Sequence, residues 1–173
     1  NSVFLGNRKF SFFCFYNMKN SFLISIFFLS MITFGQKLQS PDKQIELSVG
    51  VNKIGRPFYS LNYKTKPFIQ TSFLGVVLKN TSTLAAEFEI VYSTVSTVNE
   101  NWKPVLGEQK EIQNNYNQLV LELFQKSSKR KMNIVFRLFN EGLAFRYEFP
   151  AQENLNYFVI SDEVTQFALV GDH

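Results

Sequence analysis

The sequence predicts an all-β domain in which most strands run antiparallel, as a sandwich or a barrel. Short runs that alternate apolar and polar residues indicate strands with one buried face. Turn-forming residues separate these runs at short intervals, as is typical of antiparallel sheets. No stretch after Gln36 carries apolar residues at helical spacing for more than a turn or two. These observations favour packed sheets over a helical architecture.

The strands are predicted in order along the chain. Residues 45–51 alternate regularly, and a turn around Gly55 and Pro57 ends the run. Residues 119–124 (LVLELF) are almost continuously apolar, which predicts a strand buried on both faces. The remaining strands are predicted at residues 58–63, 68–69, 72–79 and 87–91, with polar turns between them at residues 64–67 and 80–83.

A hairpin is predicted between residues 132–139 (MNIVFRLF) and 143–150 (LAFRYEFP). If Glu141 and Gly142 form a two-residue loop, the large apolar side chains share one face and Gly142 supplies the positive φ that the turn requires. The expected cross-strand pairs are Leu138 with Phe145, Phe136 with Tyr147, and Ile134 with Phe149.

The same register places Arg137 directly opposite Arg146 on the other face of the hairpin. Like charges in direct opposition are unfavourable, so a carboxylate is expected nearby. Glu148 is one candidate, and a carboxylate from another strand or domain is another. Two interpretations stay open: a solvated surface pair, or an anchor for a neighbouring domain.

One segment, residues 99–108 (NENWKPVLGE), departs from the strand pattern and is predicted to be irregular, together with residues 114–117. Long irregular segments in compact domains are often functional. Trp102 is able either to plug the end of a sandwich or to stack on a sugar. Glu108 is able to hydrogen-bond sugar hydroxyl groups, or to be an ordinary loop residue.

The amino-terminal part predicts export. Met18, the first methionine, is followed by Lys19 and by an apolar run of 13 residues at 22–34, which fits a secretory signal peptide. Cleavage is expected after Gly35, so residues 18–35 form the leader, residues 1–17 are upstream sequence, and residues 36–173 form the mature domain. The alternative is an interrupted membrane anchor over residues 10–34. The polar and charged residues at 17–20 disfavour it, because a charge within the bilayer is costly.

Composition excludes several classes of function. Three of the 18 basic residues precede Gln36, which leaves 15 basic against 14 acidic residues and a net charge of +1 instead of +4. Nucleic-acid binding is therefore not expected, and the basic cluster at residues 129–131 is predicted to be a solvated turn. Cys14, the only cysteine, also precedes the mature domain, which excludes disulfides there. The only histidine is His173, so a Ser-His-Asp triad cannot form and no metal-binding residue is assigned.

Several segments, taken in order, resemble the N-terminal domain of glycoside hydrolase family 97, known mainly from Bacteroidetes-type bacteria. They begin with SPD at residue 40 and are residues 102–108 (WKPVLGE), 116–117, 136–150 (FRLFNEGLAFRYEFP), 153–160, 167–169 and 172–173. The resemblance makes Trp102, Glu108, Arg137, Arg146 and His173 candidates for contacts with carbohydrate or with another domain.

The resemblance implies a β-super-sandwich similar to galactose-mutarotase-like domains, incomplete at its C-terminus. In the family this domain precedes a (β/α)₈ barrel, and the enzymes act on α-glucosides or α-galactosides with calcium at the site. The catalytic carboxylates belong to the barrel, so the resemblance assigns no catalytic residue to this chain.

Three functions follow as hypotheses. The first is a non-catalytic, periplasmic or secreted part of an α-glycosidase, inactive alone, whose partners are the barrel and an oligosaccharide, with no membrane contact after leader removal. The second is a free-standing carbohydrate-binding domain, and the third a structural sandwich of a larger envelope protein. Because missing strands would leave sheet edges open, residues 36–173 are expected to be poorly soluble alone.

Overall fold

The computed structural model describes residues 35–106 and 110–171. Residues 1–34, and with them Cys14 and almost all of the expected leader, lie outside this part, as do Glu108 and His173. Within it, the chain forms strands and a single turn of 3₁₀ helix, η1 (Glu153–Leu155). The strands are β1 (Gly35–Gln39), β2 (Ile45–Val51), β3 (Pro57–Tyr63), β4 (Lys66–Phe73), β5 (Val76–Leu78), β6 (Phe88–Trp102), β7 (Ile112–Gln125), β8 (Arg130–Leu138), β9 (Leu143–Glu148) and β10 (Ile160–Glu163).

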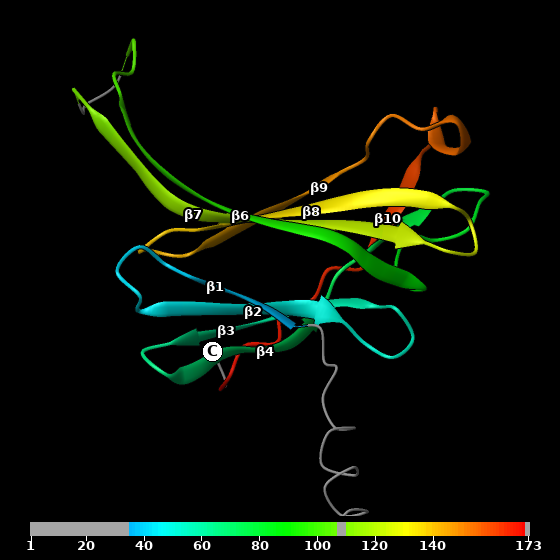
Figure 1. Ribbon diagram of the computed structural model, residues 1–173, viewed down its shortest axis with the longest axis horizontal. Helices are drawn as coiled ribbons and strands as arrows, with labels where there is room; N and C mark the ends of the chain where they lie inside the picture. Colours follow the sequence, from blue (N-terminus) through cyan, green and yellow to red (C-terminus); the bar gives the residue numbers. More distant parts are fainter. Residues whose placement is uncertain (1–34, 107–109, 172–173) are drawn as a thin grey trace, which may run out of the picture. The chain divides into compact units, whose positions relative to one another are not determined.

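The strands form three sheets in which every described pair is antiparallel. One sheet has the order β1-β2-β3-β4, a second has the order β6-β7-β8-β9, and β10 pairs with β5 in a third. Figure 1 shows the two four-stranded sheets stacked as layers. The predicted all-β, antiparallel sandwich is confirmed. No helix in the described ranges is long and apolar enough to cross a membrane.

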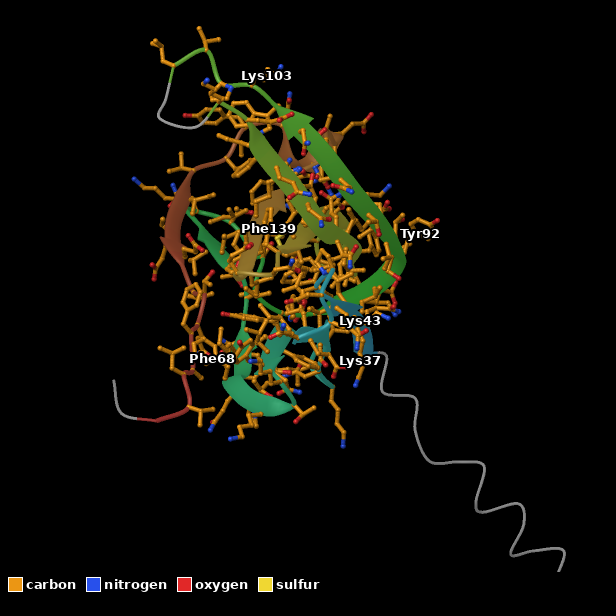
Figure 2. All side chains as sticks on the ribbon, turned by 90° about the vertical axis from the view of Figure 1, so that its left-hand side faces the viewer. Lys37, Lys43, Phe68, Tyr92, Lys103 and Phe139 are labelled. Atoms are coloured by element: carbon orange, nitrogen blue, oxygen red, sulfur yellow. The ribbon has the colours of Figure 1, made fainter. Side chains whose placement is uncertain are left out.

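The strands β6 and β7 extend beyond the rest of their sheet as a two-stranded arm. β7 pairs with β8 only from Asn117 to Gln125, whereas it pairs with β6 as far as Trp102 and Ile112. We call residues 98–106 and 110–116 the arm. Figure 2 shows Lys103, directly after β6, far from Tyr92 near the other end of that strand. The prediction of an irregular segment is wrong for residues 99–102 and 114–117, because they pair with each other in β6 and β7.

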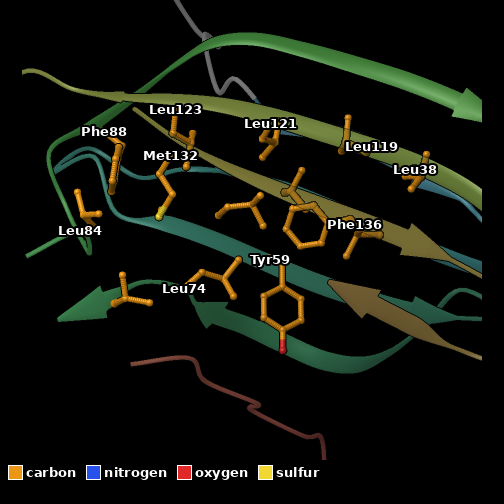
Figure 3. Packing of buried hydrophobic residues seen from close by; sticks show 14 of the residues in the cluster. Leu38, Tyr59, Leu74, Leu84, Phe88, Leu119, Leu121, Leu123, Met132 and Phe136 are labelled. Atoms are coloured by element: carbon orange, nitrogen blue, oxygen red, sulfur yellow. The ribbon is translucent and has the colours of Figure 1, made fainter. Parts of the chain in front are cut away.

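The core lies between the two four-stranded sheets and is built by alternation. Leu38, Leu47 and Leu61 lie side by side across β1, β2 and β3 and point inward. From the opposite sheet, Met132 and Phe136 point toward the layer that carries Tyr59 and Leu74 (Figure 3). The alternation in the sequence therefore specifies which face of each strand is buried.

Between Leu119 and Phe124, β7 fully buries only one of its two faces. Leu119, Leu121 and Leu123 are fully buried, whereas Glu122 is exposed and Phe124 is half-buried. The prediction of a strand buried on both faces is wrong. The other apolar side chains of this run, such as Phe124, point to the outward face of the sheet, where they are half-buried.

The hairpin of β8 and β9 forms with a different register from the predicted one. Leu138 pairs with Leu143, Phe136 with Phe145, and Ile134 with Tyr147, a shift of two residues. The Phe139 N–H donates to the Gly142 carbonyl at 2.9 Å, so the turn lies at Asn140 and Glu141 rather than at the predicted Glu141 and Gly142. Gly142 accordingly has no positive φ. A shift of two residues leaves the same side chains on the same face, so the apolar pattern alone could not distinguish the registers.

Residues 72–79 do not form one strand. β4 ends at Phe73, β5 begins at Val76, and the two belong to different sheets. Gly75 lies at the break, where a Cβ atom would come within 2.7 Å of the Cα of Ala85. The predicted turn at residues 64–67 is shorter than expected, since Lys64 and Thr65 alone have positive φ and β4 already starts at Lys66.

The segment after β10 continues along β4 without forming a regular strand. The backbone N–H of Gln166 donates to the Phe73 carbonyl at 2.9 Å, and the backbone N–H of Gln70 donates to the Ala168 carbonyl at 2.8 Å. Val170 donates to the Phe68 carbonyl at 3.0 Å. The segment therefore satisfies part of the backbone edge of β4.

Candidate functional site

Arg137 on β8 and Arg146 on β9 lie on the outward face of the β6–β9 sheet, which we call the outer face. Arg137 pairs with Ala144, and Arg146 pairs with Val135. The prediction that the two arginines are directly opposed is wrong, because the register differs by two residues. They are diagonal neighbours across the strand pair, which lessens their repulsion.

Each arginine has its own partner. The guanidinium of Arg146 donates to one carboxylate oxygen of Glu148, at 2.8 Å from Nε and 2.6 Å from Nη2, which confirms Glu148 as the expected acidic neighbour. Arg137 Nε donates to Gln118 Oε1 at 2.9 Å, and its guanidinium lies 4.7 Å from the centre of the Tyr116 ring. Within the described residues Arg137 has no carboxylate partner.

The outer face is hollowed between the two arginines. A cavity of about 130 Å³ is lined by Val135, Ala144, Phe145 and both arginines. Val135 is only 2% exposed although it points outward, and the long arginine side chains that flank it can cover it with their methylene groups. This part of the face therefore combines an apolar floor with two cations.

Trp102 lies at the far end of β6, opposite Ile112. Its side chain is 49% exposed, so it does not plug the end of the sandwich. Beyond it, Val105 and Leu106 are 99% and 91% exposed. The arm therefore ends in apolar side chains that nothing in the described residues covers.

A second hollow, which the sequence analysis did not predict, lies beside η1. Its volume is about 430 Å³, and its lining includes Lys79, Asn80, Arg130 and Tyr157. Arg130 is half-buried and donates to Thr81 Oγ1 at 2.8 Å, so the prediction of a solvated basic turn is wrong at this residue. The asparagines at 80, 154 and 156, in loops that flank Arg130 in space, are the only sequence signal of this hollow.

Among the described residues, Asp42, Tyr59 and Tyr147 have shifted pKa values, and burial raises the pKa of Tyr59 on β3. Burial also raises the pKa of Tyr147 on β9, whose hydroxyl group lies 2.7 Å from Thr165 Oγ1 in the segment after β10. A hydrogen bond from the Ser40 hydroxyl lowers the pKa of Asp42, and the Gln44 N–H adds to the effect. Asp42 and Tyr147 therefore both hydrogen-bond to neighbouring residues of the fold.

The acidic side chains of the described residues do not converge. No group of three or more His, Cys, Asp or Glu residues in these ranges is able to hold a metal ion. The described residues therefore do not by themselves assemble a calcium site of the kind that the resemblance implies.

Comparison with known proteins gives a consistent assignment. The glycosyl-hydrolase 97 N-terminal family matches residues 38–173. A glycoside hydrolase family 97 enzyme from Pseudoalteromonas sp. strain K8, solved in complex with panose and with acarbose, shares 28% sequence identity at a TM-score of 0.73. The aligned region covers 78% of this chain and 20% of that enzyme.

A β-arabinopyranosidase shares the fold, with a TM-score of 0.71 and 22% identity over 78% of this chain and 21% of that one. This chain therefore spans about a fifth of the length of the enzymes it matches. The family match covers most of the sequence and agrees with the antiparallel sheets described above. The chain belongs to glycoside hydrolase family 97, and residues 38–173 correspond to the N-terminal domain of that family.

Proposed function

We propose that this chain is a non-catalytic domain of an α-glycosidase, which supports a (β/α)₈ barrel and helps to complete its active site. The family match supports this role, as does the similarity to larger enzymes solved with panose and acarbose. In the whole protein the partner is then the barrel, and the substrate is an oligosaccharide.

The observation that carries the proposal is the apolar end of the arm. Trp102, Val105 and Leu106 are exposed at the tip of a ribbon whose strands pair only with each other there. Exposed apolar side chains grouped in this way usually mark a contact surface. We propose that the tip packs on the barrel and positions the loops that surround its substrate site.

The test uses the whole enzyme with Val105 and Leu106 both changed to serine. If the tip packs on the barrel, kcat/KM for an α-glucoside should fall between about tenfold and a hundredfold, because small displacements of a site are costly. Ile54→Ser is the matched control, since Ile54 is also exposed but lies in the turn between β2 and β3. Hydrolysis of a nitrophenyl α-glucoside measures both variants.

Equal activity and equal melting temperature in the arm variant and the Ile54→Ser control would overturn the packing of the arm on the barrel. A loss of activity in both variants to the same degree would also contradict it, because the effect would then be general. Trp102→Ala provides an independent variant at the same tip and should follow the serine pair.

Export and calcium complete the proposal. Residues 18–35 are proposed to be a cleaved leader that sends the protein to the periplasm or the medium, and N-terminal sequencing of the exported protein should then begin at Gln36.

Calcium is proposed to bind carboxylates outside the described ranges. Removal of calcium by a chelator should abolish the activity of the whole enzyme, and re-addition should restore it.

A further inference from the structure

The hollow beside η1 has a rigid floor. Arg130 joins two loops, because its guanidinium donates to Thr81 Oγ1 at 2.8 Å and to the Asn154 carbonyl at 3.2 Å. The Asn154 amide in turn donates to the carbonyls of Ser128 and Lys129 at 2.8 and 2.9 Å. The floor is therefore fixed before any ligand arrives, which lowers the entropic cost of binding.

The loop that carries η1 is held on both sides. The Lys131 N–H donates to Gln152 Oε1 at 2.7 Å, and the Gln152 amide returns a bond to the Lys131 carbonyl at 2.8 Å. Leu155 is buried in the core, and the Phe158 ring packs on Phe149 at 4.9 Å between centres. Figure 1 shows this loop beside the segment that follows β5.

The rim of the hollow differs from the floor, because its polar side chains are free. Within the described residues, the side chains of Lys79, Asn80, Glu153 and Asn156 make no hydrogen bond or ion pair, and all four line the hollow. Tyr157 completes the rim with a side chain that is 90% exposed. An aromatic ring and several free donors and acceptors thus surround one preformed cavity.

This set of groups fits a neutral sugar better than an ion. The amides of Asn80 and Asn156 each offer a donor and an acceptor, which neighbouring hydroxyl groups can use together. Lys79 and Glu153 carry opposite charges, and most donors of Arg130 are already engaged. An anion would therefore find few free donors on Arg130 and would be repelled by Glu153. The Tyr157 ring, by contrast, offers an apolar surface for the C–H face of a pyranose ring.

We infer that the hollow beside η1 is a surface-binding site for a neutral oligosaccharide, with Tyr157 as its stacking platform and Asn80 and Asn156 as its hydroxyl-binding groups. The site is separate from the arm and from the outer face, and it does not depend on contact with a barrel.

Saturation-transfer NMR on the full chain tests the site with maltotriose, cellotriose and melibiose as probes. Binding in the millimolar range is expected for at least one of them, with transfer strongest at the ring C–H protons. Tyr157→Ala should weaken binding about tenfold. Tyr157→Phe should retain it, because the ring remains. An Asn80→Ala, Asn156→Ala double variant should weaken it as well.

The matched control is Tyr92→Ala, which removes another well-exposed tyrosine ring, on β6. All these side chains lie on the surface, so the variants are expected to fold, and circular dichroism verifies it. Absence of transfer from all three sugars, or equal loss in the Tyr92 and Tyr157 variants, would overturn the site. Binding of inorganic phosphate in competition with the sugar would overturn its assignment to a neutral ligand.

Discussion

At the scale of single residues, glycine is required where a turn approaches a neighbouring strand. Gly55 has a φ of 72°, and a Cβ atom there would lie 2.4 Å from the backbone nitrogen of Phe88. The Phe88 N–H also donates to the Gly55 carbonyl at 2.9 Å. The turn between β2 and β3 is therefore fixed directly against the start of β6.

Gly55→Ala should lower the free energy of unfolding by about 1–3 kcal/mol, because alanine meets both an unfavourable φ and a backbone clash. Gly142→Ala is the matched control. Gly142 has no heavy atom within 4 Å of the added Cβ and no positive φ, so the change should stay within about 0.5 kcal/mol. Urea denaturation compares the two variants, and equal losses would contradict this account of Gly55.

The Tyr147 hydroxyl connects three segments through a chain of hydrogen bonds. It accepts from the Gly75 N–H at 3.0 Å and lies 2.7 Å from Thr165 Oγ1. Because the Thr165 hydroxyl donates to Glu163 at 2.6 Å, Tyr147 is the donor to Thr165. Ionisation of Tyr147 would remove that donor, and burial raises the pKa of its hydroxyl.

Tyr147→Phe should cost about 1–2 kcal/mol at neutral pH through the lost hydrogen bonds. The raised pKa of Tyr147 also predicts an alkaline effect. Its contribution is fully present below the unfolded pKa of about 10 and is lost as pH rises through the higher folded pKa. The difference in unfolding free energy between wild type and Tyr147→Phe should therefore shrink in alkali. A difference that grows with pH would contradict the assignment.

At the scale of elements, the loop between β5 and β6 is attached to the end of β7 by Gln125. This side chain is buried, and its amide donates to the carbonyls of Thr83 and Ala86, both at 2.8 Å. Its carbonyl oxygen accepts from the Ser128 hydroxyl. One glutamine thus satisfies backbone groups of a loop that carries no ladder of its own.

Gln125→Met should destabilise the domain by about 1–3 kcal/mol, because it keeps the size of the buried side chain but removes the donor to the carbonyls of Thr83 and Ala86. Gln113→Met, at an exposed position of the arm, should change the stability by less than about 0.5 kcal/mol. Thermal melting followed by circular dichroism measures both. If the methionine at 125 were as stable as wild type, the bonds to the loop would carry no net energy.

The elements also show how far the sequence predicts this fold. Alternation identifies which side chains of β2, β3 and β8 are buried, since burial of a strand face has a period of two. It cannot identify the register of β8 with β9, because a shift by two residues conserves every face. It also misses the arm, whose strands expose polar residues such as Asn101 and Gln113 and so lack the apolar signal of a half-buried strand.

The candidate site is less accessible to sequence reasoning than the fold. Arg137 and Arg146 were placed on one face of one hairpin, which is confirmed, and Glu148 was identified as a partner of Arg146. The hollow beside η1 brings Arg130 together with two loops. One loop lies about 50 residues before Arg130 in the chain, and the other about 25 residues after it. No local pattern encodes such a contact, because it depends on how separate turns meet after the sheets have packed.

At the scale of the molecule, one aromatic side chain joins the two large sheets and the segment after β10. The Phe145 ring on β9 lies 5.8 Å from Tyr59 on β3 and 6.1 Å from Phe167. It also contacts Phe136 on β8 at 6.0 Å. The layers are therefore expected to unfold together, because the same ring contributes to each of their contacts.

Phe145→Ala should lower the free energy of unfolding by about 3 kcal/mol, since it leaves a cavity between the sheets. Phe68→Ala, at an exposed position on β4, should change it by less than about 0.5 kcal/mol. Unfolding in urea is followed by far-ultraviolet dichroism for the sheets and near-ultraviolet dichroism for aromatic packing. The two midpoints should fall together in Phe145→Ala, because the ring joins both sheets into one cooperative unit. Separate midpoints would show that the sheets unfold independently and that Phe145 stabilises only its own layer.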